Sequence, residues 1–118
     1  MAFTLNHLHI KSPNPADTAQ WYINNLGATR VADIAGRGVR IDLHGLTVNI
    51  TGIIDSQTHP QNYGIEHVAI NTDDIASVLA GVQANGGKVL EEINGDNGRK
   101  VCFVEGPDGV CLEIIGTA

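Results

Sequence analysis

Apolar and polar residues alternate along several short stretches of the chain, and two longer stretches repeat with the period of a helix. The alternation over Thr4–Lys11 predicts a strand with one buried face. A helix is predicted to follow, because Asn14 can cap it, Pro15 suits its first position and Gly27 is a typical C-terminal stop. Its buried stripe is expected to consist of Ala19, Tyr22, Ile23 and Leu26.

The same order of elements is predicted in both halves of the chain. The first half continues with three short strands, over Ala28–Ile34, Gly38–Leu43 and Leu46–Thr51, before the polar link Ile53–Asn62. The second half begins with a strand over Gly64–Asn71 and a helix from about Asp74, whose expected buried stripe is Ile75, Val78, Leu79 and Val82. Its last three strands are predicted over Lys88–Ile93, Arg99–Glu105 and Val110–Ile115.

The two halves are related by an internal repeat. Shifting the first half by 60 residues aligns His7 with His67 and Gly27 with Gly87. Each half therefore reads βαβββ, and the fold class is predicted to be α+β. We expect one domain over residues 1–118, with modules of about 1–58 and 59–118. Because neither half can bury both faces of so small a sheet, the modules are expected to share a core or a cleft.

The charge balance limits the partners that this chain can have. The net charge of −6 disfavours nucleic acid and anionic membranes, and no apolar run reaches transmembrane length, so we expect a cytoplasmic protein.

The cysteines and two of the histidines are expected to have structural roles or none. The two cysteines, Cys102 and Cys111, are expected on neighbouring strands as buried, reduced thiols. His44 and His59 are expected in a turn and in the link, exposed to water.

Four further residues carry candidate chemistry. His7 and His9 lie two residues apart on a predicted strand, so their imidazoles share one face. Taken alone, His7 and His67 can be ordinary hydrogen-bonded strand residues, and Glu113 can face water at an edge. A carboxylate within the apolar run VCLEII is costly to bury, however, unless a metal ion or a partner compensates it.

The segments NHLHI, WYINNLG, IEHVAI and FVEGPDGVCLEI, in this order and spacing, resemble the vicinal oxygen chelate superfamily. That superfamily includes glyoxalase I, methylmalonyl-CoA epimerase, extradiol dioxygenases and the fosfomycin- and bleomycin-resistance proteins. The resemblance covers essentially the whole chain. It implies two βαβββ modules that form a curled mixed sheet around a cleft holding one divalent metal ion, and a homodimer. Trp21 and Tyr22 differ in helical phase, so Trp21 is a candidate for a module or subunit contact.

The resemblance also implies the ligands. His7, His67 and Glu113 match the metal-binding positions, and an offset of 64 places Asn49 opposite Glu113, as a fourth ligand or a neighbour of the ligands. Two imidazoles and one carboxylate form a facial site with open positions, which accepts Fe, Ni, Co, Mn or Zn. Such a site can polarise a carbonyl or hydroxyl group of a small substrate.

The leading function is that of a glyoxalase-like or epimerase-like lyase or isomerase, which transfers a proton next to a metal-polarised carbonyl. Glu113 would be both a metal ligand and the catalytic base. Asn49 departs from a two-carboxylate mechanism, because an amide cannot take a proton. His9 is a candidate acid, base or cleft-lining residue, and Arg99 is a candidate cleft-lining residue that could bind an anion.

Three alternatives stay open. An extradiol-type Fe(II) dioxygenase shares the His, His, Glu pattern, although Tyr63 is the only tyrosine in the second half. A fosfomycin-modifying thiol transferase shares the same triad, but no basic residue follows Glu113. A non-catalytic, bleomycin-resistance-like binding protein is disfavoured by the retained triad and by the aromatic content of 4%.

Overall fold

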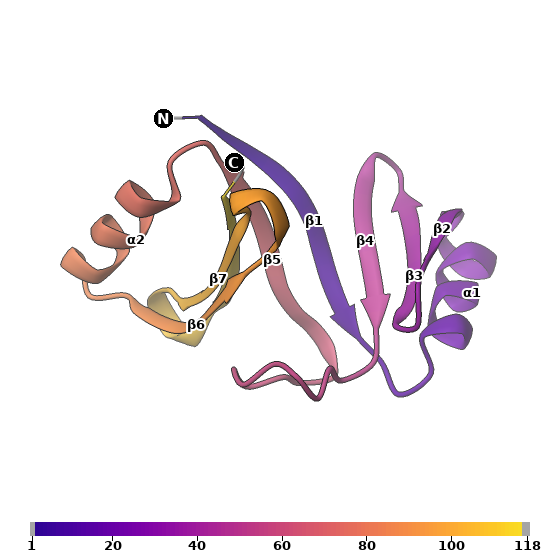
Figure 1. The fold of residues 1–118 in the computed structure, drawn as a ribbon. Coiled ribbons are helices and arrows are strands. Elements are labelled where there is room, and N and C mark those ends of the chain that lie inside the picture. The colour runs from indigo at the N-terminus through magenta and orange to yellow at the C-terminus, as the bar shows by residue number, and fades with distance from the viewer. Residues whose placement is uncertain (1, 117–118) are drawn as a thin grey trace. The chain divides into compact units, whose positions relative to one another are not determined.

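The computed structural model describes residues 2–116 and confirms the α+β fold class (Figure 1). The chain divides into two compact units. The N-terminal module consists of residues 7–66, and the C-terminal module contains residues 2–6 and 67–116. The division falls within two strands, since β1 (Phe3–Lys11) and β5 (Gly64–Thr72) each contribute to both units.

The N-terminal module packs one helix on one face of its strands. Its elements are the end of β1, α1 (Pro15–Leu26), β2 (Thr29–Ile34), β3 (Gly38–Leu43) and β4 (Leu46–Thr51). The strand order is β2-β3-β4-β1, in which β4 runs parallel to β1 and antiparallel to β3. The α1 helix lies beside β2 and β3 (Figure 1) and shares a core with the strands that includes Ile10, Ala19, Ile41, Val48 and Ile50.

The ends of α1 are set by local chemistry, as predicted. The Asn14 side chain accepts a hydrogen bond from the Asp17 backbone N–H, and Gly27 takes the left-handed conformation with φ of 71°. The prediction that Leu26 is buried is wrong, because this residue is 47% exposed. The last turn of α1 is met by the β3–β4 turn, where His44 Nε2 lies 2.7 Å from the Leu26 carbonyl oxygen. Leu26 is the last residue of α1, and its side chain is not among those that pack against the apolar core of this module.

The C-terminal module repeats this plan. Its elements are the end of β5, α2 (Ile75–Ala84), β6 (Lys88–Asn94), β7 (Lys100–Glu105) and β8 (Cys111–Gly116), with short 3₁₀ turns η1 (Asp96–Gly98) and η2 (Pro107–Gly109). The strand order is β5-β8-β7-β6, in which β8 runs parallel to β5 and antiparallel to β7. The α2 helix packs on one face, over a core that includes Leu79, Cys102, Val104 and Ile114.

The start of β1 is attached to the C-terminal module by side-chain hydrogen bonds. The Asn71 amide donates to Thr4 Oγ1 at 3.0 Å, and the Asn6 amide donates to Asn71 Oδ1 at 3.0 Å. The Ala2 backbone N–H donates to Asp73 Oδ1 at 2.9 Å. Residues near the start of the chain therefore complete a unit whose other members begin 60 residues later.

The predictions for the cysteines and the two loop histidines have mixed outcomes. Cys102 and Cys111 lie on the neighbouring strands β7 and β8 and form no disulfide, and Cys111 is only half-buried. Burial raises the pKa of the Cys102 thiol, and the nearby Glu92 carboxylate raises it further. His44 lies in an exposed turn as expected, with a positive φ of 54°.

The expectation that His59 is exposed to water is wrong, because this residue is only 4% exposed. Its Nε2 lies 3.2 Å from Oε1 of Glu66, and both side chains are almost completely buried. The link between β4 and β5 thus folds back so that His59 reaches a buried acidic partner. None of the helices in residues 2–116 is long and apolar enough to cross a membrane.

Candidate functional site

In each module the predicted site residues lie on the sheet face opposite the helix, which we call the site face. On β1, His7, His9 and Lys11 alternate with residues that pack in the α1 core, so all three point to the site face. The parallel register pairs His9 with Asn49 and Lys11 with Thr51. These two β4 residues therefore point to the same face as the β1 side chains.

The N-terminal site face carries a buried chain of polar contacts, which we call the polar row. His7 Nε2 lies 3.3 Å from His9 Nδ1, and His9 Nε2 lies 2.7 Å from Thr51 Oγ1. Lys11 Nζ donates to Thr51 Oγ1 and to the Gly52 carbonyl oxygen, each at 3.0 Å. Lys11 is 1% exposed, and a buried ammonium group is costly unless such acceptors surround it. The row therefore fixes the positions of two imidazoles and one cation.

Asn49 is held by a basic partner on the neighbouring strand. Arg40 is its antiparallel register partner on β3, and Arg40 Nε donates to Asn49 Oδ1 at 2.9 Å. The amide oxygen, which is the atom able to ligate a metal, is thus directed to the guanidinium group. The arrangement favours Asn49 as a residue that positions Arg40.

The C-terminal site face brings together two of the predicted ligands. His67 Nε2 lies 3.1 Å from Glu113 Oε1, although the residues are separated by 46 positions in the sequence. His67 is buried and the Glu113 side chain is 13% exposed. The His67 ring meets Phe103 edge to face, with ring centroids 5.2 Å apart. The rest of this face carries the buried apolar cluster Ala69, Val101, Phe103 and Ile115, and also the half-buried Glu91, which is the register partner of Phe103.

The His67–Glu113 pair fits a divalent ion in its donor chemistry and in its spacing. Imidazole nitrogen and carboxylate oxygen are common ligands of first-row metal ions. Two donors bound at about 2.0–2.1 Å to one ion lie roughly 2.8–3.4 Å apart for angles between a right angle and a tetrahedral one. The observed separation of 3.1 Å falls within this range.

Strand register shows that the two site faces are built on the same backbone positions. In the N-terminal module Asn49 has His9 as its parallel partner and Arg40 as its antiparallel partner. In the C-terminal module Glu113 has Ala69 and Phe103 in these two places. The alignment of Asn49 with Glu113 that the sequence suggested is therefore realised in the pairing of the strands.

Arg99 is not brought to the C-terminal pair. It is exposed, between η1 and the first residue of β7, and its backbone is bonded to Gly95 and Asp96. The register partner of Glu113 is Phe103, four residues further along the chain. At about 3.3 Å per residue, this places Arg99 roughly 13 Å away along the strand. Its cleft-lining role stays a prediction.

Sequence reasoning missed three members of the N-terminal site face: Arg40, Lys11 and Thr51. The alternation in GVRIDL places Arg40 opposite the buried Val39 and Ile41, which was a usable signal. The two-residue turn between β3 and β4 is a second signal, because it sets the register that pairs Arg40 with Asn49.

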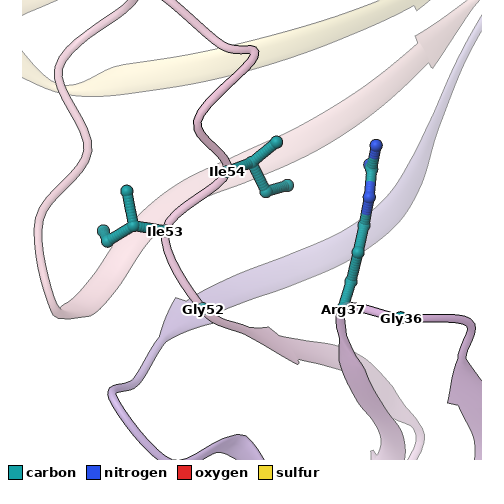
Figure 2. Close-up of a pocket in the computed structure, with 5 residues that line it drawn as sticks. All are labelled: Gly36, Arg37, Gly52, Ile53 and Ile54. Carbon is teal, nitrogen blue, oxygen red and sulfur yellow. The ribbon is translucent and has the colours of Figure 1, made fainter.

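A surface pocket of about 260 Å³ opens next to the polar row (Figure 2). It is lined by Gly36, Arg37, Gly52, Ile53 and Ile54. The extended Arg37 side chain forms one wall, and the two isoleucines extend from the chain on the other side (Figure 2). The pocket adjoins the polar row through the Gly52 carbonyl group, which accepts from Lys11.

Residues 4–114 match the sequence model of the Glyoxalase/Bleomycin resistance protein/Dioxygenase superfamily. The match covers nearly the whole chain, so this protein belongs to that superfamily and the resemblance seen in the sequence is confirmed. No curated protein matches the sequence.

Solved structures show the same fold at low sequence identity. A hypothetical protein from Bacillus halodurans C-125 matches with a TM-score of 0.73 and 19% identity, covering 100% of this chain and 96% of its own. The methylmalonyl-CoA epimerase from Mycobacterium tuberculosis matches with a TM-score of 0.63 and 17% identity, over 97% of this chain and 87% of its own. The Mn(II)-bound glyoxalase from Novosphingobium aromaticivorans matches with a TM-score of 0.61 and 14% identity, over 96% of this chain and 37% of its own.

Proposed function

We propose that this protein is a metal-dependent enzyme that transfers a proton next to the carbonyl group of a small substrate, as a lyase or isomerase. The observation that carries the proposal is the His67–Glu113 pair, an imidazole and a carboxylate 3.1 Å apart on a largely apolar face. Membership of the superfamily supports it, as does a fold shared with an epimerase and a Mn(II)-bound glyoxalase.

His67 and Glu113 would hold the divalent ion, and the superfamily pattern adds His7 as the third ligand. When bound, such an ion polarises a carbonyl oxygen and so acidifies the neighbouring carbon. Its identity stays open among Fe, Ni, Co, Mn and Zn, because this donor set accepts all of them.

The protein residues would then supply the base and its surroundings. Glu113 would take the proton from the carbon next to the carbonyl group and return it during product formation. The Phe103 ring and the buried Ala69 and Ile115 exclude water from this face, which strengthens electrostatic interactions there. Asn49 would position Arg40, since its amide oxygen accepts from that guanidinium group.

The experiment that tests this proposal is elemental analysis of the protein purified without chelator or affinity tag. We expect about one equivalent of metal per chain, lost in His67→Ala and in Glu113→Ala. The control is His44→Ala, because His44 lies in an exposed turn, and this variant should keep its metal. Circular dichroism checks that each variant is folded. Full metal content in folded His67→Ala would contradict the proposed site.

Activity assays then separate the reaction classes. Isomerisation of a glutathione hemithioacetal, or epimerisation of an acyl thioester, would support proton transfer. Oxygen uptake with catechols would instead indicate the extradiol dioxygenase, and thiol addition to fosfomycin would indicate the transferase. Failure to bind metal even after reconstitution would favour a non-catalytic binding protein.

We also propose a cytoplasmic homodimer. The exposed apolar residues Trp21, Leu26 and Val31 on α1 and β2 support a subunit contact, and two cysteines outside any disulfide suit a reducing compartment. Light scattering should then give twice the mass of one chain.

A further inference from the structure

We propose that His9 is a metal ligand through Nδ1, so that the N-terminal module supplies two imidazole donors, His7 Nε2 and His9 Nδ1. The inference rests on the proposed metal site and extends its donor set beyond His7, His67 and Glu113. It is argued from contacts within the N-terminal module alone.

The spacing of the two nitrogens is that of neighbouring ligands. His7 Nε2 and His9 Nδ1 lie 3.3 Å apart, inside the range of about 2.8–3.4 Å for two nitrogens bound to one ion. The ring centroids are 5.3 Å apart and the planes are inclined by 60°. The rings are therefore not stacked, and they approach each other through nitrogen-bearing edges. Both residues are more than nine-tenths buried, so this edge contact is part of the packed structure.

The hydrogen bonds of Thr51 assign the proton on His9. Lys11 Nζ has no acceptor capacity, so Thr51 Oγ1 accepts from it at 3.0 Å. The Thr51 hydroxyl donates its single proton to the Gly52 carbonyl oxygen at 3.2 Å. With the hydroxyl proton placed in this way, the contact with His9 Nε2 at 2.7 Å is one in which the imidazole donates, and the spectroscopic test below checks this tautomer. A neutral His9 protonated at Nε2 has its lone pair at Nδ1, on the side of His7.

This is the arrangement that metal-binding histidines require. One ring nitrogen binds the ion while the other donates its N–H to a protein oxygen, which fixes the tautomer and the ring orientation. Thr51 Oγ1 is that oxygen for His9, and Lys11 in turn anchors Thr51. The buried lysine thus has a role in the site that its sequence position alone did not indicate.

The internal repeat explains why a second histidine occurs here. In the C-terminal module the second donor is Glu113 on β8, and its parallel partner is Ala69. In the N-terminal module the corresponding β4 residue is Asn49, whose oxygen is engaged by Arg40, and its parallel partner is His9. Each module therefore offers two donors. The C-terminal module has His67 and the Glu113 carboxylate, whereas the N-terminal module has His7 and the imidazole of His9, on the strand adjacent to Asn49.

The test is long-range ¹H–¹⁵N correlation spectroscopy of histidine-labelled protein, with and without Zn(II). We expect His9 to be protonated at Nε2 in both states, and its Nδ1 signal to move from an unprotonated to a metal-bound position. The variant His9→Gln assigns the signals. In chelator competition, His9→Ala should weaken Zn(II) binding more than 100-fold. Thr51→Val, which keeps the shape but removes the acceptor, should weaken it about 10–100-fold with unchanged stoichiometry.

The outcomes distinguish the inference from the proposal beneath it. If Zn(II) binds at one equivalent and shifts His67 while the His9 Nδ1 signal stays in place, His9 is not a ligand, and the proposed function stands. If Zn(II) shifts none of the histidine signals, both fail. A His9 proton found at Nδ1 in the metal-loaded protein would also overturn the inference. The His44→Ala variant should bind Zn(II) as the wild type does.

Discussion

The site faces of the two modules share a backbone plan and differ in the side chains that fill it. Where the N-terminal face has Arg40 beside Asn49, the C-terminal face has Phe103 beside Glu113. The buried polar row of the first contrasts with the apolar cluster of the second, which holds one imidazole–carboxylate pair. The two modules therefore keep the same strand register, although one face carries polar and charged side chains and the other carries mainly apolar ones.

The difference matters for chemistry because the local dielectric sets the strength of electrostatic interactions. A carboxylate on a largely apolar face interacts strongly with a nearby cation, and it loses more by being left unpaired. A row of hydrogen-bonded donors spreads its charge over several groups instead. The apolar face suits a single reactive base, and the polar face suits the positioning of donors.

The largest expected effect separates the equivalent residues Phe103 and Arg40. Phe103 is 1% exposed within an apolar cluster, so Phe103→Ala should lower the free energy of unfolding by about 3–5 kcal/mol. Arg40 is half-buried and makes one hydrogen bond to Asn49, so Arg40→Ala should cost about 1 kcal/mol. Urea denaturation followed by circular dichroism measures both. Equal losses would mean that the two faces contribute alike to stability.

The next effect compares two buried His–Glu pairs whose members Glu66 and His67 are adjacent in the sequence. The His59–Glu66 pair lies in the N-terminal module and has nearly no exposed side-chain surface. Glu66→Gln should therefore lower the free energy of unfolding by about 1.5–3 kcal/mol and leave the metal content of the folded protein unchanged. Glu113→Gln should do the reverse, with a smaller loss of stability and loss of metal. Denaturation together with elemental analysis decides it, and metal lost from both variants would show that the pairs are not independent.

The smallest effect concerns the first turns of the helices. Asp74 caps α2, and hydrogen bonds from the Ser77 side chain and backbone N–H hold the pKa of its carboxyl below the usual value of 3.8. Its contribution is fully present above about pH 4 and is lost as the pH falls through the lowered pKa. The corresponding cap of α1 is the amide of Asn14, which does not titrate.

Amide hydrogen exchange near pH 5 and pH 3 tests this prediction. The protection factor of Ser77 should fall on acidification, and Asp74→Asn should remove most of that pH dependence. The Asp17 amide in the first turn of α1 is the internal comparison. A fall of equal size in Asp74→Asn would assign the effect to another group.

Much of the fold followed from the sequence because its determinants are local. The cap Asn14, the stop at Gly27 and the periodic stripes predicted both helices, and alternation with turn residues predicted the strands. The meeting of His67 with Glu113 was predicted through the repeat and the family pattern, which carry information about strand pairing.

The parts that were missed involve contacts between different elements, and not all of these are distant in the sequence. Arg40 had a local signal, because the two-residue turn between β3 and β4 sets the register that pairs it with Asn49. His59 was read as a solvated linker residue because nothing local marks Glu66 as its buried partner. Leu26 has the right helical phase for burial, but it is the last residue of α1 and its side chain does not reach the core.

The division of β1 between the modules has a consequence for folding during synthesis. By the time residue 66 has left the ribosome, all of the N-terminal module has been made, and it can fold first. Residues 2–6 must meanwhile wait for Asn71 and Asp73, and the C-terminal module is complete only after β8 has been synthesised. The first residues to be synthesised are then among the last to fold.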